Sequence, residues 1–545
     1  MPPSTHQAEN PQPHAARATS SPSPEAAEAD LRARLASAPD DVEALNDLGN
    51  VLKAAGKVAA AETCYRDAIA RRPNFAVALN NLGNLLRQQG HLEEGIAHLR
   101  AAVAAWPEQA DIQNNLGVAL HDALDYAGAE AALHKALRCH AGHIEALNNL
   151  GNLHKDLRRP QQALAAYRKV LQLQPEHPDA RWNLALLHLQ RGDYRNGWPL
   201  YESRHDPRRQ TAEVFLPPVN TPMWRGESLA GKHLLIWHEQ GMGDEIQFAR
   251  FIPQLRARFA VDRITLFCKS PLQRLLRRIP GVDHCLPLGA RIPAHDCWTL
   301  PGSLPGRFDC MPGSIPDQLP YLDVPAEIQA RWQQRLPANG RLRVGLVWSG
   351  SRWHKNDRNR SLPDLALLAP IWQIPDIDFY CLHKQAADDP AEQQARLPPI
   401  GQPLSHLGPE IDDFLDSAAI LQQLDLLISV DTAIVHLAGA LARPAWVMLP
   451  WHGCDWRWLE HAEDSVWYPG CLRLFRQGPG ETWSGVIDRL AKALARWRVE
   501  RLMLRGRIAA LSPADRDALR LAVDRLSLQK NDISPGSSPP PTASP

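Results

Sequence analysis

The tetrapeptide Asn-Asn-Leu-Gly stands at residues 80–83, 114–117 and 148–151, and the variant Asn-Asp-Leu-Gly stands at 46–49. The glycines that close these copies are 34 residues apart: Gly49, Gly83, Gly117 and Gly151. An altered fifth copy reads Trp182-Asn183-Leu184-Ala185. Self-similarity at a fixed period of this length predicts stacked helical hairpins.

Other columns of the repeat recur with the same spacing. Prolines precede most new copies (Pro73, Pro107, Pro175), and one column keeps small residues (Ala61, Gly95, Ala129, Ala163, Gly197). Small side chains let two helices approach closely, while bulky ones fill the space beside them (Tyr65, Leu99, Leu133, Tyr167, Tyr201). The pattern resembles tetratricopeptide repeats. It predicts an α-solenoid of about five repeats, which would be a protein-binding surface.

The composition excludes several classes of protein. Lys plus Arg and Asp plus Glu both number 60, so the net charge of zero argues against binding to nucleic acid or to a membrane surface. No apolar run approaches the roughly 20 residues of a membrane span. The nine cysteines form no Cys-x-x-Cys pair, and no secretory leader is visible. We expect a cytoplasmic protein without a metal site.

The sequence changes character near residue 206. Helical periodicity gives way to short apolar runs, each followed by a glycine-containing turn or a helical pattern, which predicts parallel sheets. The expected strands are 233–238, 263–268, 343–348, 376–383, 424–430 and 445–449. The expected parts of the chain are a disordered tail (1–25), repeats (26–205), a linker (206–231), two Rossmann-like domains (232–337 and 338–500), C-terminal helices (501–529) and a second tail (530–545).

Open parallel sheets bind ligands beyond the carboxyl ends of their strands, so polar residues that follow a strand are candidates for a site. The first such segment is Gly241-Met242-Gly243-Asp244. Its glycines, Gly241 and Gly243, allow a tight turn and close approach of a ligand. Asp244 could face the cleft or simply cap the following helix.

The second segment runs from Trp348 to Arg360. It places Ser349, Gly350 and Ser351 after a strand and then brings four cations within nine positions, among them Lys355. Hydroxyl groups, backbone N–H groups and a lysine can hold a diphosphate. A solvated basic loop is the alternative interpretation.

The third segment is Ser429-Val430-Asp431-Thr432, which leads into a helix that contains His436. Free N–H groups and the positive end of the helix dipole would point into the cleft at Asp431 and Thr432. An Asp–Thr pair at a helix start is also a common cap, and a lone histidine such as His436 is more often structural. Trp451, Trp456 and Trp458 could stack on a base or a sugar, although core packing is the simpler role.

Taken together, these segments resemble a GT-B glycosyltransferase of the heptosyltransferase-like glycosyltransferase family 9, over 234–498. Val430 to Ala438 is similar to the family signature Asp-Ser/Thr-x-x-x-His-Leu-Ala, and Gly243-Asp244 resembles the pair whose aspartate is the proposed catalytic base. The resemblance implies that Ser349, Ser351, Lys355, Asp431, Thr432 and His436 bind a nucleotide-sugar donor. It also implies that no metal or other cofactor is needed.

The joining of repeats to such a domain resembles the architecture of O-GlcNAc transferase. In that enzyme a ladder of asparagines holds the backbone of the protein substrate, and the matching column here is Asn81, Asn115, Asn149 and Asn183. Asparagine can donate to and accept from an extended peptide. Asparagines in such repeats also cap and bridge helices, so both interpretations stay open.

The sequence therefore predicts an inverting, metal-independent glycosyltransferase. It would move a sugar from a nucleotide-diphosphate donor to a hydroxyl acceptor, and its repeats would recruit a protein substrate or partner. The alternative is a non-catalytic scaffold that carries a degenerate sugar- or nucleotide-binding domain. A dinucleotide-dependent oxidoreductase fits less well, because the third glycine of its fingerprint is missing.

Overall fold

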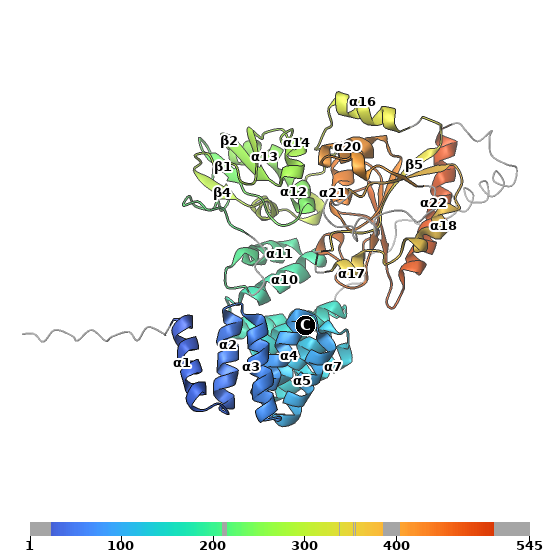
Figure 1. The fold of residues 1–545 in the computed structure, drawn as a ribbon. Coiled ribbons are helices and arrows are strands. Elements are labelled where there is room, and N and C mark those ends of the chain that lie inside the picture. Colours follow the sequence, from blue (N-terminus) through green and yellow to red (C-terminus); the bar gives the residue numbers. More distant parts are fainter. Residues whose placement is uncertain are drawn as a thin grey trace, which may run out of the picture. The chain divides into compact units, whose positions relative to one another are not determined.

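The computed structural model describes residues 23–209, 215–336, 338–352, 354, 356–384 and 404–505. The chain divides into two compact units, of which the first ends at Pro175 and the second starts at Glu176 (Figure 1). The predicted tails, apart from 23–25, lie outside the described residues, as do Lys355 and positions 506–529 of the predicted C-terminal helices.

The first unit is a solenoid of antiparallel helices (Figure 1). A single helix, α1, precedes four helical hairpins, and each hairpin packs on the next. The bounds are α1 Pro24–Ser37, α2 Val42–Ala54, α3 Val58–Arg71, α4 Ala76–Gln89, α5 Leu92–Ala105, α6 Ala110–Asp122, α7 Tyr126–Cys139, α8 Ile144–Asp156 and α9 Pro160–Leu173.

Close packing inside each hairpin explains the recurring glycines. A Cβ on Gly151 would lie 2.4 Å from Cε1 of Tyr167, and one on Gly49 would lie 2.5 Å from the matching atom of Tyr65. Both rings are fully buried, and the Tyr167 hydroxyl donates to Asn152 at 2.8 Å. The glycine of one helix therefore leaves the space that the large side chain of its partner fills.

The second unit begins with one more helical hairpin, α10 (Pro178–Gln190) and α11 (Tyr194–Tyr201), followed by the 3-10 turn η1 (Glu202–His205). The sequence analysis grouped this hairpin with the other repeats in 26–205. The compact units instead separate it from them, because its aromatic side chains join the same hydrophobic core as the two sheets.

The first sheet is fully parallel, with strand order β3-β2-β1-β4. Helices α12 to α14 pack on one face through the core that contains Leu234 and Ile264. Val219 and Met223 pack on the other face, so part of the predicted linker belongs to this domain. The bounds are β1 His233–Ile236, α12 Met242–Phe248, α13 Ile252–Phe259, β2 Arg263–Cys268, α14 Gln273–Leu276, β3 His284–Pro287, β4 Cys297–Thr299, α15 Leu304–Arg307 and α16 Ala326–Arg335.

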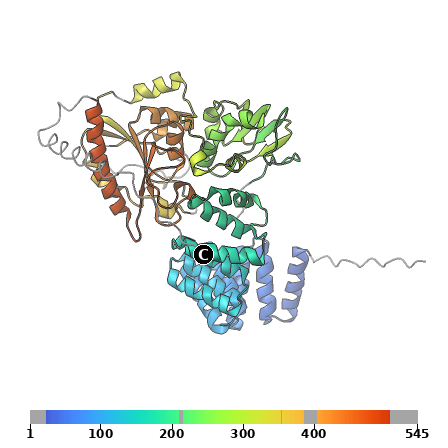
Figure 2. The same cartoon turned by 180° about the vertical axis from the view of Figure 1, so that it is seen from behind.

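The second sheet is also parallel, and its order β10-β9-β8-β5-β6-β7 is that of a doubly wound fold. Helices α20 and α21 cover one face, and α18 and α22 cover the other (Figures 1 and 2). The bounds are β5 Leu342–Val347, α17 Asp357–Arg360, α18 Ala369–Trp372, β6 Ile377–Cys381, β7 Leu404–His406, α20 Phe414–Gln423, β8 Leu426–Val430, α21 Ala433–Ala440, β9 Ala445–Leu449, β10 Leu472–Arg476 and α22 Trp483–Leu504.

The structure corrects several expected boundaries. The helix expected at 245–259 begins at Met242 and is interrupted by the 3-10 turn Ala249–Phe251, beside Pro253, which cannot donate a helical hydrogen bond. The strands β3, β4, β7 and β10 were not predicted; β4 and β7 have three residues each and carry little pattern. Helix α22 runs through position 501, where a new segment was expected to begin.

Gly151→Ala tests the packing of the repeats. In an open helix this change would stabilise the protein by about 1 kcal/mol. Here the new methyl group would overlap the immobile Tyr167 ring, so we expect a loss of about 1–3 kcal/mol in the free energy of unfolding. Chemical denaturation measures it. Gly142→Ala is the control, because its nearest contact of 3.5 Å is ordinary; equal effects of the two changes would contradict this explanation.

Candidate functional site

A cavity of about 680 Å³ lies at the carboxyl ends of the strands of both sheets. In the second sheet it opens above β5 and β8, which are neighbours although a long stretch of sequence separates them. Such a switch point is where doubly wound sheets bind ligands. The predicted residues that line the cavity are Gly241, Gly243, Asp244, Ser349, Ser351, Asp431, Thr432 and His436.

Asp244 stands in the first turn of α12, and both of its carboxylate oxygens have partners. Oδ2 accepts the Gly241 N–H at 2.9 Å, so the helix-capping role is real. Oδ1 forms an ion pair with Arg457, which comes from the second sheet domain. The aspartate therefore caps its own helix and also faces the cavity.

Burial is the main influence on the acidity of Asp244. Burial raises its pKa, the Arg457 guanidinium opposes the rise, and the result lies above the ordinary aspartate value. A carboxylate with a raised pKa is a stronger base than an exposed aspartate.

Gly243 permits the contact between the two sheet domains. A Cβ at this position would lie 2.8 Å from the His436 ring and 3.3 Å from the Cα of Ala433. The start of α12 therefore packs directly on the start of α21, and this contact brings the segments after β1 and β8 to the same cavity.

The backbone of the segment after β5 donates three hydrogen bonds to two side chains. Nε2 of His383 accepts the N–H groups of Trp348 and Ser349, and the Ser361 hydroxyl accepts the Gly350 N–H at 2.9 Å. Arg360 lies against Gly350, where a Cβ would be 2.3 Å from its guanidinium. Ser349, Ser351 and Arg360 all line the cavity, whereas Lys355 lies outside the described residues.

The segment after β8 places Asp431 and Thr432 at the start of α21. The Thr432 hydroxyl lies 3.2 Å from the Ser429 hydroxyl and does not cap the helix. The Asp431 carbonyl accepts a hydrogen bond from Arg360 at 3.2 Å, which joins this segment to the one after β5. Burial, together with the charge of Asp455, raises the pKa of Asp431 to about 6.

His436 lines the cavity but is held by structural contacts. Its Nδ1 lies 3.1 Å from the Tyr468 hydroxyl, and its ring stacks on Trp458. Burial and the nearby Arg457 lower its pKa to about 3, so the ring is neutral at physiological pH. The structural role named for this histidine is thus observed, and the predicted donor contact stays a prediction.

The sequence analysis missed Arg457, which is the most connected side chain of the cavity. It pairs with Asp244, donates to both Asp455 oxygens at 3.0 Å and donates to Gln247. Burial would lower its pKa, but the carboxylates of Asp244 and Asp455 outweigh burial and raise it. A signal was present, because Arg457 lies in the segment after β9. The tryptophans on either side dominate the local sequence pattern, and Trp456 and Trp458 are buried in the core.

The predicted asparagine ladder of the first unit bridges neighbouring repeats. Asn81 donates to Asn46 at 2.8 Å; Asn115 and Asn149 donate at 2.8 and 2.9 Å to the equivalent asparagines of the repeats before them, Asn80 and Asn114. Asn183 lies on α10, in the second unit. The bridging interpretation is observed for Asn81, Asn115 and Asn149, and the contact with a peptide stays a prediction.

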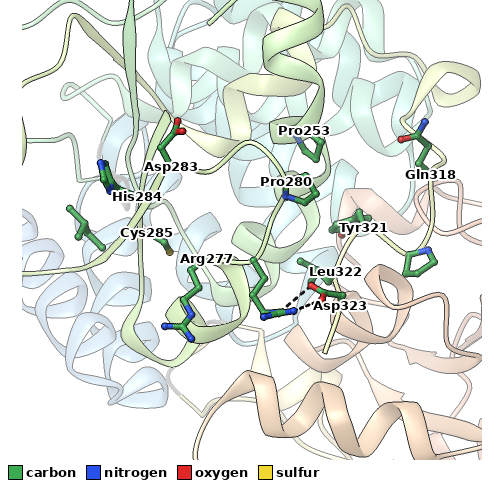
Figure 3. A pocket seen from close by; sticks show the side chains of 13 residues that line it. Pro253, Arg277, Pro280, Asp283, His284, Cys285, Gln318, Tyr321, Leu322 and Asp323 are labelled. Carbon is green, nitrogen blue, oxygen red and sulfur yellow. Dashed lines mark hydrogen bonds and ion pairs between the residues drawn. The ribbon is translucent and has the colours of Figure 1, made fainter. Parts of the chain in front are cut away.

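A second hollow, of about 870 Å³, lies on the first sheet domain near β3 (Figure 3). Three of its charged side chains have partners: Arg278 and Asp323 pair with each other, and Asp283 pairs with Arg256. None of the predicted site residues lines it.

Within the part of the chain that the structure describes, no group of three or more His, Cys, Asp or Glu side chains is arranged to hold a metal ion. None of the helices in that part of the chain combines the length and the apolar character that crossing a membrane requires.

Comparison with known proteins identifies the repeats. A tetratricopeptide-repeat family model matches residues 46–97, 80–144 and 148–197, so the N-terminal part is a solenoid of the kind that mediates protein interaction. The chain is similar to PilF of Pseudomonas aeruginosa (22% identity, 31% of this chain and 78% of that chain, TM-score 0.29). It is also similar to a thermophilic tetratricopeptide protein of Thermus thermophilus (26%, 30% and 91%, TM-score 0.28).

A longer similarity links the chain to Protein FlbA of Caulobacter vibrioides. The two are 28% identical over 328 residues, which cover 56% of this chain and 53% of that protein. The chain thus spans about half the length of this curated relative. The matched 56% of this chain is longer than the stretch from residue 1 to the end of the predicted repeats at residue 205. The match therefore includes part of the sheet-containing region.

The raised pKa of Asp431 predicts a pH-dependent stability. An unfolded aspartate releases its proton near pH 3.9, whereas folded Asp431 retains it to about pH 6. The folded state binds more protons between these values, so its stability falls as the pH rises through them. We expect the thermal midpoint of Asp431→Asn, relative to the native chain, to rise between pH 4 and pH 7.

Asp206→Asn is the control, because its thermal midpoint relative to the native chain should fall as the pH rises. The hydrogen bond from Arg208 lowers the pKa of Asp206 to about 2, so its stabilising contribution grows as the pH rises from about 2 to 4. A relative midpoint of Asp431→Asn that stays constant with pH would contradict the assigned burial of this carboxyl group.

Proposed function

We propose that the chain is a metal-independent inverting glycosyltransferase with a GT-B arrangement of its two sheet domains. It would move a sugar from a nucleotide-diphosphate donor to a hydroxyl acceptor, and the repeats would recruit a protein substrate or partner. The observation that supports this most is that one cavity is lined by Asp244 from the first sheet and by Ser349, Asp431 and Thr432 from the second. The proposed base, Asp244, and the residues proposed to bind the diphosphate thus line the same cavity.

The second sheet would bind the donor diphosphate. Arg360 supplies a cation at the carboxyl end of β5, and Ser349 and Ser351 supply hydroxyl groups. The start of α21 adds backbone N–H groups and the positive end of a helix dipole. Lys355, five residues before Arg360 in the sequence, would add a further cation. Donors held in place before the reaction stabilise the charge that develops on a leaving group.

The first sheet would supply the base. The acceptor oxygen attacks the anomeric carbon, its proton passes to the Asp244 carboxylate, and the bond from that carbon to the phosphate oxygen breaks. The electron pair of that bond leaves with the nucleoside diphosphate. Because attack comes from the face opposite the leaving group, the configuration at the anomeric carbon inverts.

Arg457 would act on the base and on the substrates in the cavity. Its ion pair favours the charged form of Asp244, and its guanidinium lies in the cavity wall. Asp431, with a pKa of about 6, would bind a hydroxyl group of the donor sugar, because a carboxyl group near its pKa can either accept or donate a hydrogen bond.

Donor binding is the first test. We expect one family of nucleoside diphosphates, among UDP, GDP and ADP, to raise the thermal midpoint of the full chain without added metal. Arg360→Ala should weaken this binding about tenfold or more, because it removes a charged contact to phosphate. Isothermal titration calorimetry measures the affinity.

Arg358→Ala is the matched control. Arg358 stands on the same short helix, is exposed and does not line the cavity, so its removal should leave the affinity unchanged. Equal losses in both variants would point to a general charge effect. No binding by any of the three diphosphates to the folded chain would favour the non-catalytic scaffold.

The role of Asp244 is tested separately. Asp244→Asn keeps the shape of the side chain but cannot accept a proton, so we expect transfer to fall by about 100-fold or more while diphosphate affinity changes little. Single-turnover transfer with the donor identified above measures the rate. Transfer at the native rate by this variant would remove Asp244 as the base.

A further inference from the structure

The last helical hairpin and η1 contain a fully buried arginine that does not line the cavity. Arg204 is 0% exposed, and its guanidinium donates in five directions. It pairs with both oxygens of Glu239, and it donates to Glu202 at 2.9 Å, to the Tyr201 carbonyl at 3.2 Å and to the Ser303 hydroxyl at 2.8 Å. Every N–H of the guanidinium thus has an acceptor, which a buried cation requires.

Glu239 connects this arginine to the segment after β1. It is 3% exposed and also accepts the Gly302 N–H at 2.9 Å. A Cβ on Gly302 would lie 2.8 Å from its carboxylate, so the glutamate fits closely between Arg204 and the backbone. The chain then turns at Gln240, whose φ is 54°, and reaches Gly241, which donates to Asp244.

The same hairpin also holds the partner of Asp244. Trp198 of α11 contacts Trp456 edge to face at 5.5 Å, and Tyr201 contacts it at 6.0 Å. The guanidinium of the next residue, Arg457, lies over the Trp456 ring at 4.5 Å. This part of the chain therefore contacts the neighbours of both members of the pair: Arg204 binds Glu239 on the Asp244 side, and Trp198 packs on Trp456 on the Arg457 side.

We propose that Arg204 is a positioning residue, which holds Asp244 against Arg457 through Glu239 and the turn at Gln240–Gly241. The last repeat is then a structural part of the catalytic unit and not only the end of a binding surface. This inference rests on the proposed role of Asp244. Removing Arg204 would leave the Glu239 carboxylate buried without its cation, and the turn would move to give it water.

A thiol placed at the site of Asp244 can report this positioning without a donor or an acceptor. In the full-length Asp244→Cys variant, Arg457 would favour the thiolate and shift its alkylation by iodoacetamide to lower pH. Peptide mass spectrometry follows this one cysteine among the native ones. The midpoint of the pH–rate profile reports the nearby charge, while the plateau rate reports accessibility.

Arg204→Lys in this background keeps the charge but loses the forked geometry. We expect the alkylation midpoint to rise by about one pH unit, because the thiol moves away from Arg457. Asp376→Asn is the matched control, since it breaks another arginine pair of the unit, with Arg498, away from the cavity; it should lower the thermal midpoint and leave the alkylation midpoint unchanged.

An unchanged midpoint in folded Arg204→Lys would overturn the proposal. If that variant does not melt cooperatively, Ser303→Ala removes one of the five acceptors of Arg204, together with the hydrogen bond that the hydroxyl donates to Glu202. It should raise the midpoint by a smaller amount, and no rise there would overturn the proposal equally. The thiol titration succeeds or fails whether or not a nucleotide binds, so its result is separate from that of the proposed function.

Discussion

The ion pair between Asp244 and Arg457 is the interaction on which the arrangement of the site depends. Asp244 follows the first strand of one sheet, and Arg457 follows a strand of the other. Both side chains are mostly buried, so neither could be left without a partner. Removing one member of a buried pair typically costs about 3–5 kcal/mol. The pair therefore favours the relative position of the two sheet domains in which Asp244 and Arg457 are in contact.

Such a pair stabilises the fold only if its remaining hydrogen-bonding capacity is also met. Arg457 satisfies this condition through Asp455 and Gln247, and Asp244 through the Gly241 N–H. Gly243 adds the steric condition, because only a residue without a Cβ lets α12 approach α21. The chemistry proposed for Asp244 thus depends on packing that extends well beyond the residues that line the cavity.

Much of the candidate site was predictable from the rule that parallel strands end in binding loops. The segments at Gly241–Asp244, Ser349–Ser351 and Asp431–Thr432 were found in this way, and they line a common cavity. Arg457 was missed because it follows its strand at a distance, among tryptophans that dominate the local pattern. The carboxyl group of Asp431 illustrates a different limit: its pKa is raised by burial and by the charge of Asp455, which is distant in sequence.

The sequence by itself determined the repeats, since a period of 34 residues encodes local hairpins that need only their neighbours. It also indicated six of the strands described in the region that follows, because apolar runs that end in glycine turns are local signals. Only the tertiary structure decided that the last hairpin belongs with the sheets, and that Arg204, Glu239, Asp244 and Arg457 form one connected network. These contacts join residues far apart in the chain, and burial makes each charge depend on partners that no local pattern identifies.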